Sequence, residues 1–255
     1  MNPQSHNLEP KLYFGDLFDQ LKPEEKVEII KPKVKRNETL DLIVNGYEKG
    51  LENFGLYLEH KLKIKIPESE FSWYYIAKLS APSEIQSKEI TEFSLLSGEH
   101  ENKKDFEYFT GWYLSALINE SRDKDFKIFT NCSKTTHNIG YKNTKNIDVN
   151  GNAGNWVGGY MEGGEITVNG NVGDWIGNEM KDGKITINGN VGRWVGWGMK
   201  DGKITINGNV GDWVGLVMRD GKIYLNGDYK SLSDYIYGGN IYHKDKLIIE
   251  NGKRL

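Results

Sequence analysis

The chain has 255 residues, 37% of them hydrophobic, so it can bury a core in one or two domains. Its formal net charge of −3 gives no overall basic field, so we expect no nucleic-acid partner. The single cysteine, Cys132, excludes an intrachain disulfide and a cysteine metal cluster. The first residues lack the basic and apolar regions of a signal peptide, and no run of ~18 apolar residues occurs. We therefore expect a cytoplasmic protein without membrane contact.

Residues 1–130 are expected to form an α+β domain. In chain order the expected elements are a short edge strand within a basic stretch at 28–36, a helix after Asn37, strands at 62–66 and 71–79, helices from Pro82 and over about 105–120, and a strand at 127–130. The first helix is predicted because Asn37 suits an N-cap and apolar residues follow at spacings of three and four. The two central strands are predicted from alternation and from aromatic and β-branched residues.

Residues 131–255 follow a 19-residue repeat rich in glycine. Two series of glycines recur at this period, and they are Gly151, Gly170, Gly189 and Gly208, then Gly158, Gly177, Gly196 and Gly215. Nineteen residues are too few for a two-helix repeat, but they allow about three short strands joined by corners. We expect Gly173, Gly177 and Gly183 to turn these corners with positive φ.

The predicted fold is therefore mainly β, a right-handed parallel β-solenoid of 19-residue coils that follows the α+β domain. A lone coil would bury too few aliphatic side chains to offset the conformational entropy of 19 ordered residues, so only a stack can fold. Both ends of such a stack need a cover, because exposed strand edges recruit other chains. We expect the first domain to cover one end and the divergent tail after Ser231 to cover the other.

Stacking places equivalent residues of successive coils above one another. The tryptophan ladder defined by this period consists of Trp156, Trp175, Trp194 and Trp213. It is interpreted either as packing at a corner of the coil, as a protein-docking stripe or as a carbohydrate platform. Two series of asparagines recur at the same period, one beginning at Asn150 and the other at Asn152, and we expect both to serve the structure through coil-to-coil hydrogen bonds.

The repeated G-x-x-G-x-x-x-G pattern, ending in a G-x-I-x-V/I-x-G strand, resembles a known β-helix superfamily. The matching glycines are Gly151, Gly154 and Gly158 with Gly164 and Gly170, and then Gly173, Gly177, Gly189, Gly192, Gly196, Gly208, Gly211 and Gly215. The similarity covers residues 138–245 and is to the β-helix subunit of formylmethanofuran dehydrogenase and to the C-terminal domain of the large subunit of glutamate synthase. It implies a β-helix that holds catalytic partners in place and carries no catalytic residues.

No catalytic, cofactor-binding or metal-binding set stands out among the residues. The histidines do not form the i, i+4 pair of a zinc helix, and the recurring aspartates do not reproduce a calcium β-roll. We therefore expect a non-catalytic scaffold, with another protein subunit or a second copy as its partner and with no cofactor. Two alternatives stay open. One is an enzyme whose site lies at the junction of the two halves, using Cys132 and His137, and the other is a ligand-binding module built on the tryptophan ladder.

Overall fold

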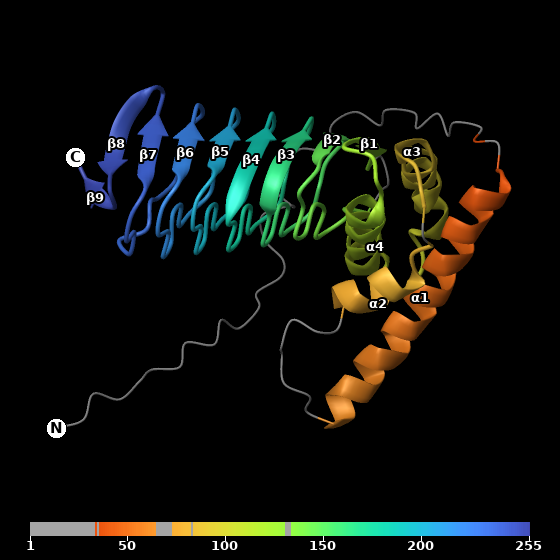
Figure 1. Cartoon of the computed structure of the whole chain (residues 1–255). Coiled ribbons are helices and arrows are strands. Elements are labelled where there is room, and N and C mark those ends of the chain that lie inside the picture. The colour runs from red at the N-terminus through yellow and green to blue at the C-terminus, as the bar shows by residue number, and fades with distance from the viewer. Residues whose placement is uncertain (1–33, 35, 65–72, 83, 131–133) are drawn as a thin grey trace. The chain divides into compact units, whose positions relative to one another are not determined.

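The computed structural model describes residues 34, 36–64, 73–82, 84–130 and 134–255. The predicted edge strand at 28–36 lies almost entirely outside this range, and Cys132 lies fully outside it. The described residues begin with helices and continue into stacked coils (Figure 1). The helical elements are α1 (Glu38–Ile64), α2 (Trp73–Ser80), α3 (Ser87–Leu96), the short 3-10 helix η2 (Ser97–His100) and α4 (Phe106–Glu120).

The first helix begins where the sequence predicts. Asn37 Oδ1 accepts a hydrogen bond from the Leu40 N–H at 2.8 Å, which is the N-cap arrangement expected for this residue. The helix continues to Ile64, so the predicted strand at 62–66 is wrong for its first three residues, and its last two lie outside the described range.

The predicted strand at 71–79 is also wrong, because the chain forms α2 from Trp73 onward. Tyr74 and Ala77 of this helix pack against the core, as does Ala81 directly after its last residue, and their spacings of three and four follow a helix. Packing against α1 and α4 therefore overrides the preference of aromatic residues for strands. Helix α3 begins five residues later than expected from Pro82. The described elements before Asp125 are thus all helical. The strand expected at 127–130 is confirmed as Asp125–Phe129, so within residues 1–130 only the two central strands are corrected to helix.

The strands form one sheet in sequence order. They are β1 (Asp125–Phe129), β2 (Asn146–Asn150), β3 (Glu162–Val168), β4 (Asp182–Ile187), β5 (Lys203–Ile206), β6 (Lys222–Leu225), β7 (Asn240–His243), β8 (Lys246–Glu250) and β9 (Lys253–Arg254). Strands β1 to β7 pair in parallel. From β2 to β6 residues 19 apart face each other, as in Ile166, Ile185 and Ile204, whereas the partners are 21 residues apart between β1 and β2 and 18 apart between β6 and β7. The expected solenoid of 19-residue coils is confirmed.

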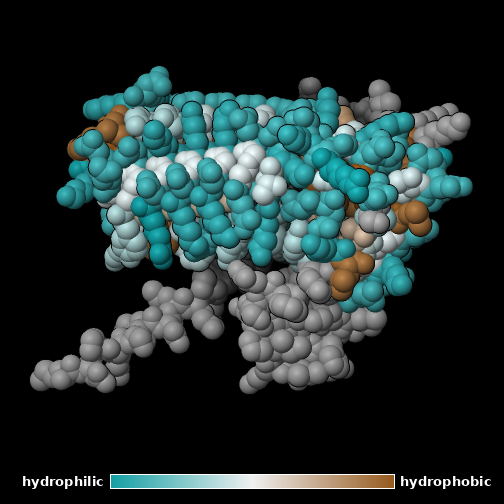
Figure 2. All heavy atoms as spheres, in the orientation of Figure 1, coloured by the Kyte–Doolittle hydropathy of each residue, from teal (hydrophilic) through white to brown (hydrophobic). Residues whose placement is uncertain are grey.

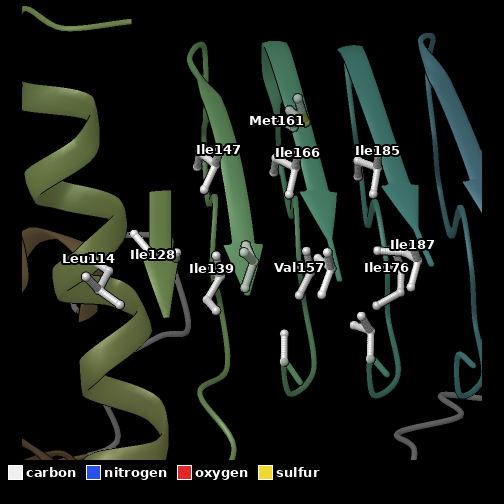
Figure 3. Close-up of a cluster of buried hydrophobic side chains, with 14 of the residues drawn as sticks. Leu114, Ile128, Ile139, Ile147, Val157, Met161, Ile166, Ile176, Ile185 and Ile187 are labelled. Carbon is white, nitrogen blue, oxygen red and sulfur yellow. The ribbon is translucent and has the colours of Figure 1, made fainter. Parts of the chain in front are cut away.

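The interior of the coils is a stack of aliphatic columns. Ile185 and Ile187 of β4 point inward and are fully buried, as the alternation of the strand predicts. Further columns contain Ile176 and Met180 with their equivalents in neighbouring coils. Figure 3 shows these columns running on to Leu114 of α4, so helices and coils share one core.

The repeated glycines have two different roles. Gly158, Gly177, Gly196 and Gly215 have φ between +63° and +75°, a left-handed conformation that favours glycine. Gly183 is also left-handed, but Gly173 is not, so its predicted role is wrong. Instead, a side chain at Gly173 would collide with Asn155 of the preceding coil. The same kind of close approach to the preceding backbone explains Gly170, Gly189 and Gly208.

Both ends of the sheet are covered, as expected. Helix α3 lies against β1, where Thr91 Oγ1 donates to the Lys127 carbonyl at 2.7 Å and Ser94 Oγ accepts from the Phe129 N–H at 3.0 Å. At the other end β8 reverses direction and pairs with β7 antiparallel, and β9 follows as two charged residues. A short, charged edge is one of the ways in which proteins prevent strand addition.

Candidate interaction surface

The four residues of the tryptophan ladder lie at one corner of successive coils with an unusual backbone conformation. Trp156, Trp175, Trp194 and Trp213 have φ between +60° and +67°. The left-handed region costs a residue other than glycine roughly 1–2 kcal/mol, and asparagine is one of the few residues that visit it readily. In the coil before the ladder the equivalent position is Asn138, with φ of +62°. The two positions are equivalent because the Asn138 N–H donates to the Asn155 carbonyl in the same way as the Trp156 N–H donates to the Asp174 carbonyl.

The first three indole rings of the ladder stack on one another along the solenoid. Trp156 and Trp175 have ring centroids 6.5 Å apart and planes 18° apart, and Trp175 and Trp194 are 4.5 Å and 23° apart. Stacking of this kind contributes about 0.5–1.5 kcal/mol per pair. Trp213 is 45% exposed and the other three are half-buried. The indoles therefore pack at a corner, as one of our interpretations held, and still reach the surface.

A column of polar residues precedes the ladder by one position. Asn155 Oδ1 accepts from the Asp174 N–H at 2.8 Å, and Asp174 Oδ1 accepts from the Arg193 N–H at 2.6 Å. Asp174 Oδ2 also binds Arg193 Nη2 at 3.2 Å, and the Arg193 guanidinium lies 4.4 Å from the Trp194 ring centroid. Farther along, Asp212 Oδ1 accepts from Ser231 Oγ at 3.1 Å. These acceptors are therefore already used inside the solenoid.

The asparagine ladders serve the structure, as expected. Asn188 Nδ2 donates to Asn169 Oδ1 at 2.8 Å, and Asn207 Nδ2 donates to Asn188 Oδ1 at 2.7 Å. Asn150 does not join this ladder, because Asn169 donates to Asp148 instead and the Asn150 amide nitrogen is buried without a partner. In the second ladder the side-chain oxygen accepts a backbone N–H of the next coil, as Asn152 does from Asn171 at 2.8 Å.

His137 lies where helix α4 meets the first coil. Its ring stacks on Tyr108 at 4.7 Å between centroids, and its backbone N–H donates to the Glu107 carbonyl. Burial lowers the pKa of the imidazole to about 4, so it is neutral at pH 7. Its Nδ1 already accepts the Asn155 N–H at 2.8 Å. Through these contacts His137 links helix α4 to the first coil. Its pairing with Cys132 stays a prediction.

The recurring aspartates that directly precede a glycine stabilise turns of the backbone. Asp182, Asp201 and Asp220 each accept the N–H of the following glycine at 2.6–2.7 Å. Among the described residues, no group of three or more histidine, cysteine, aspartate or glutamate side chains could hold a metal ion. Within the same residues, no helix has the length and apolar character needed to span a membrane.

A second aromatic feature escaped the sequence prediction. Trp197, Leu216 and Tyr235 form a column on successive coils, because each carbonyl accepts an N–H from the coil before it. We call these three residues the apolar column. Tyr235 is 61% exposed, and Trp197 and Leu216 are half-buried. The equivalent residues in the earlier coils are Gly159 and Asn178. A position-by-position comparison of coils would have revealed this switch from small or polar to large and apolar.

The strand face of the coils has a different character. On the side seen in Figure 2, hydrophilic side chains run in rows across β3 to β6, while hydrophobic ones gather near the C-terminal strands and over the helices. Pairs such as Lys184 with Glu165 and Lys181 with Glu162 link neighbouring coils there.

Comparison of the sequence with protein-family models and with curated proteins gives no match.

Proposed function

We propose that the protein is a non-catalytic scaffold whose solenoid holds another protein chain. The observation that carries this proposal is the group of exposed or half-buried aromatic and apolar side chains on the later coils, which consists of the apolar column, Trp213 and Tyr237, the last being 67% exposed. Tryptophan and tyrosine are enriched where proteins bind one another.

The polar residues of the repeat support the same proposal. Asparagine, aspartate and arginine side chains at repeated positions are engaged in coil-to-coil hydrogen bonds, as Asn188 and Arg193 illustrate. A catalytic site needs polar groups free to act on a substrate. Here the repeated asparagine, aspartate and arginine side chains are used in hydrogen bonds between coils, while aromatic and apolar side chains reach the surface.

The resemblance of residues 138–245 to β-helices of formylmethanofuran dehydrogenase and glutamate synthase suggests the first partner to look for. In those enzymes the β-helix is associated with catalytic subunits or domains. We therefore propose an oxidoreductase subunit as the partner class, with self-association as the second arrangement to examine.

The test is purification of the full chain, carrying an affinity tag, from its native source, followed by measurement of the molar mass of the eluted species. We expect a stable assembly that contains a second protein or a second copy. A variant with Trp197→Asn and Tyr235→Asn should release the partner but keep the far-ultraviolet circular dichroism spectrum. Recovery of the unaltered chain only as a free monomer would contradict the proposal.

A further inference from the structure

Folding of the coils does not require tryptophan at the ladder position. Asn138 occupies the equivalent place in the preceding coil with the same left-handed backbone conformation. Asparagine suits the left-handed region better than tryptophan does. Four successive coils nevertheless keep an indole there and expose part of it, and strained residues of this kind concentrate at functional sites.

The ladder itself offers hydrogen-bond donors, and most of the side-chain acceptors beside it are already engaged. An indole carries one N–H and no acceptor, and none of the four N–H groups is bonded to another described residue. Asn155 Oδ1, both carboxylate oxygens of Asp174 and one oxygen of Asp212 already accept hydrogen bonds within the solenoid. A ligand bound to this surface would therefore contact a row of indole N–H donors flanked by the apolar edges of the rings.

We infer that the tryptophan ladder binds a proline-rich segment in the polyproline II conformation. This inference rests on the proposed scaffold function and names the chemistry of the partner. Proline has a backbone carbonyl and no N–H, so a proline-rich chain presents acceptors without donors and an apolar surface between them. Such segments are known to dock on aromatic surfaces in a preformed, extended state.

The backbone repeat of the coils is close to the repeat of a polyproline II helix. The backbones of neighbouring coils are ~4.8 Å apart, so equivalent backbone positions two coils apart are separated by about 9.6 Å. The indole rings depart from this even spacing, with centroids 6.5 Å apart for Trp156 and Trp175 and 4.5 Å apart for Trp175 and Trp194. A polyproline II helix rises ~3.1 Å per residue with three residues per turn, so equivalent carbonyls recur every ~9.3 Å. The ladder spans three coil intervals, about 14 Å, which matches about five residues of such a helix.

Two other occupants fit the ladder less well. An added β-strand brings a row of N–H donors, and most of the side-chain acceptors beside the ladder are already engaged. A carbohydrate platform needs a row of open aromatic faces, but the two central indoles are covered. Trp175 has Trp194 stacked on it at 4.5 Å and Trp197 edge-on at 5.2 Å, and Trp194 carries the Arg193 guanidinium.

The probe is a synthetic peptide of about nine prolines, with a glycine–serine peptide of the same length as the ligand control. Binding to the full chain is measured by calorimetry and by the change in tryptophan fluorescence. The test variant replaces Trp156, Trp175 and Trp194 with phenylalanine, which keeps the stacked rings and removes the donors. The matched control replaces Tyr224 and Tyr242, stacked aromatics on the strand face, with the threonine that Thr205 provides in the preceding coil.

We expect the proline peptide to bind the unaltered chain and the Tyr224→Thr/Tyr242→Thr control alike, and to bind the phenylalanine variant at least about tenfold more weakly. If that variant does not fold, Trp175→Asn with Trp194→Asn takes its place, since Asn138 shows that asparagine fits this backbone. No binding of the proline peptide, equal binding by the phenylalanine variant, or binding of a β-linked glucose hexamer in its place would overturn the inference. Retention of the native partner by the phenylalanine variant would likewise overturn it and leave the scaffold proposal standing.

Discussion

At the scale of single residues, the repeat depends on positions where only glycine fits. Gly177 is the clearest case. It has φ of +63°, and a Cβ added there would lie 2.5 Å from Ile204 Cδ1 of the next coil. Gly163 is its opposite, because a Cβ there would meet nothing within 4 Å and its backbone is not left-handed. Glycine is thus required at one position and replaceable at the other.

We expect Gly177→Ala to lower the free energy of unfolding by roughly 2 kcal/mol, since alanine is strained in the left-handed region and its methyl group crowds a packed core. The matched substitution Gly163→Ala should be neutral or stabilise by up to about 1 kcal/mol by restricting the unfolded chain. Urea unfolding of both variants measures the difference. Equal losses at the two positions would show that crowding and φ do not decide the outcome.

His137 gives the molecule a dependence on pH. The pKa of its imidazole is about 4 in the folded chain and about 6.5 in the unfolded chain, so the unfolded chain binds the proton more readily. The neutral imidazole therefore makes its full contribution to the free energy of unfolding above pH 6.5. This contribution is lost as the pH falls toward 4, and the loss is at most about 3 kcal/mol. Urea unfolding of the native chain from pH 7 to pH 4.5 should show this loss.

The control for this dependence is His137→Asn, which can still accept the Asn155 N–H but does not titrate. Its stability should fall less steeply over the same range. Parallel pH profiles for the two proteins would remove His137 as the cause and leave the groups present in both, namely the carboxylates and His100, whose pKa burial also lowers.

At the scale of elements, the first strand of the solenoid, β1, is covered by a helix. Strand β1 has β2 on one side and helix α3 on the other, and a helix cannot continue a ladder of backbone hydrogen bonds. The hydroxyls of Thr91 and Ser94 satisfy two of the exposed strand groups instead. Covering an edge with a helix protects it from other chains.

We expect Ser94→Ala to lower stability by about 1–2 kcal/mol, because it leaves the Phe129 N–H without its acceptor in a buried place. Amide hydrogen exchange should show faster exchange at Phe129. The control is Ser97→Ala, whose hydroxyl is also buried but donates to Ser94 within the helical turns. Unchanged protection of Phe129 in Ser94→Ala would mean that the hydroxyl does not cover the edge.

At the scale of the whole molecule, the described helices and coils share one continuous core. Phe109 and Leu114 of α4 belong to the same cluster of buried residues as Ile139 and Ile166 of the coils. In repeat proteins, stability passes between neighbouring units through shared interfaces. The helical region should therefore fold together with the first coils.

We expect Phe109→Ala, which removes a fully buried ring, to cost about 3–5 kcal/mol. Because the core is shared, helix content by circular dichroism and tryptophan fluorescence should lose their signals at the same, lower urea concentration. Leu42→Ala on α1, where the side chain is 60% exposed, serves as the control and should leave both transitions in place. Separate transitions in Phe109→Ala would show that the two regions unfold independently.

The sequence alone determined the coils, their 19-residue register and the columns of isoleucine, asparagine and tryptophan. It could do so because each coil repeats the same local chemistry, so one alternating strand and one set of turns determine all the others. It also predicted the Asn37 cap and the helix of Phe106–Glu120, where capping and apolar spacing agree.

Only the tertiary structure decided that residues 73–80 are helical, that Thr91 and Ser94 cover a strand edge, and that the indoles of the ladder sit in the left-handed region while remaining partly exposed. The physical reason is the same in each case. These features depend on contacts between segments far apart in the chain, and such contacts outweigh local preferences of about 1 kcal/mol per residue.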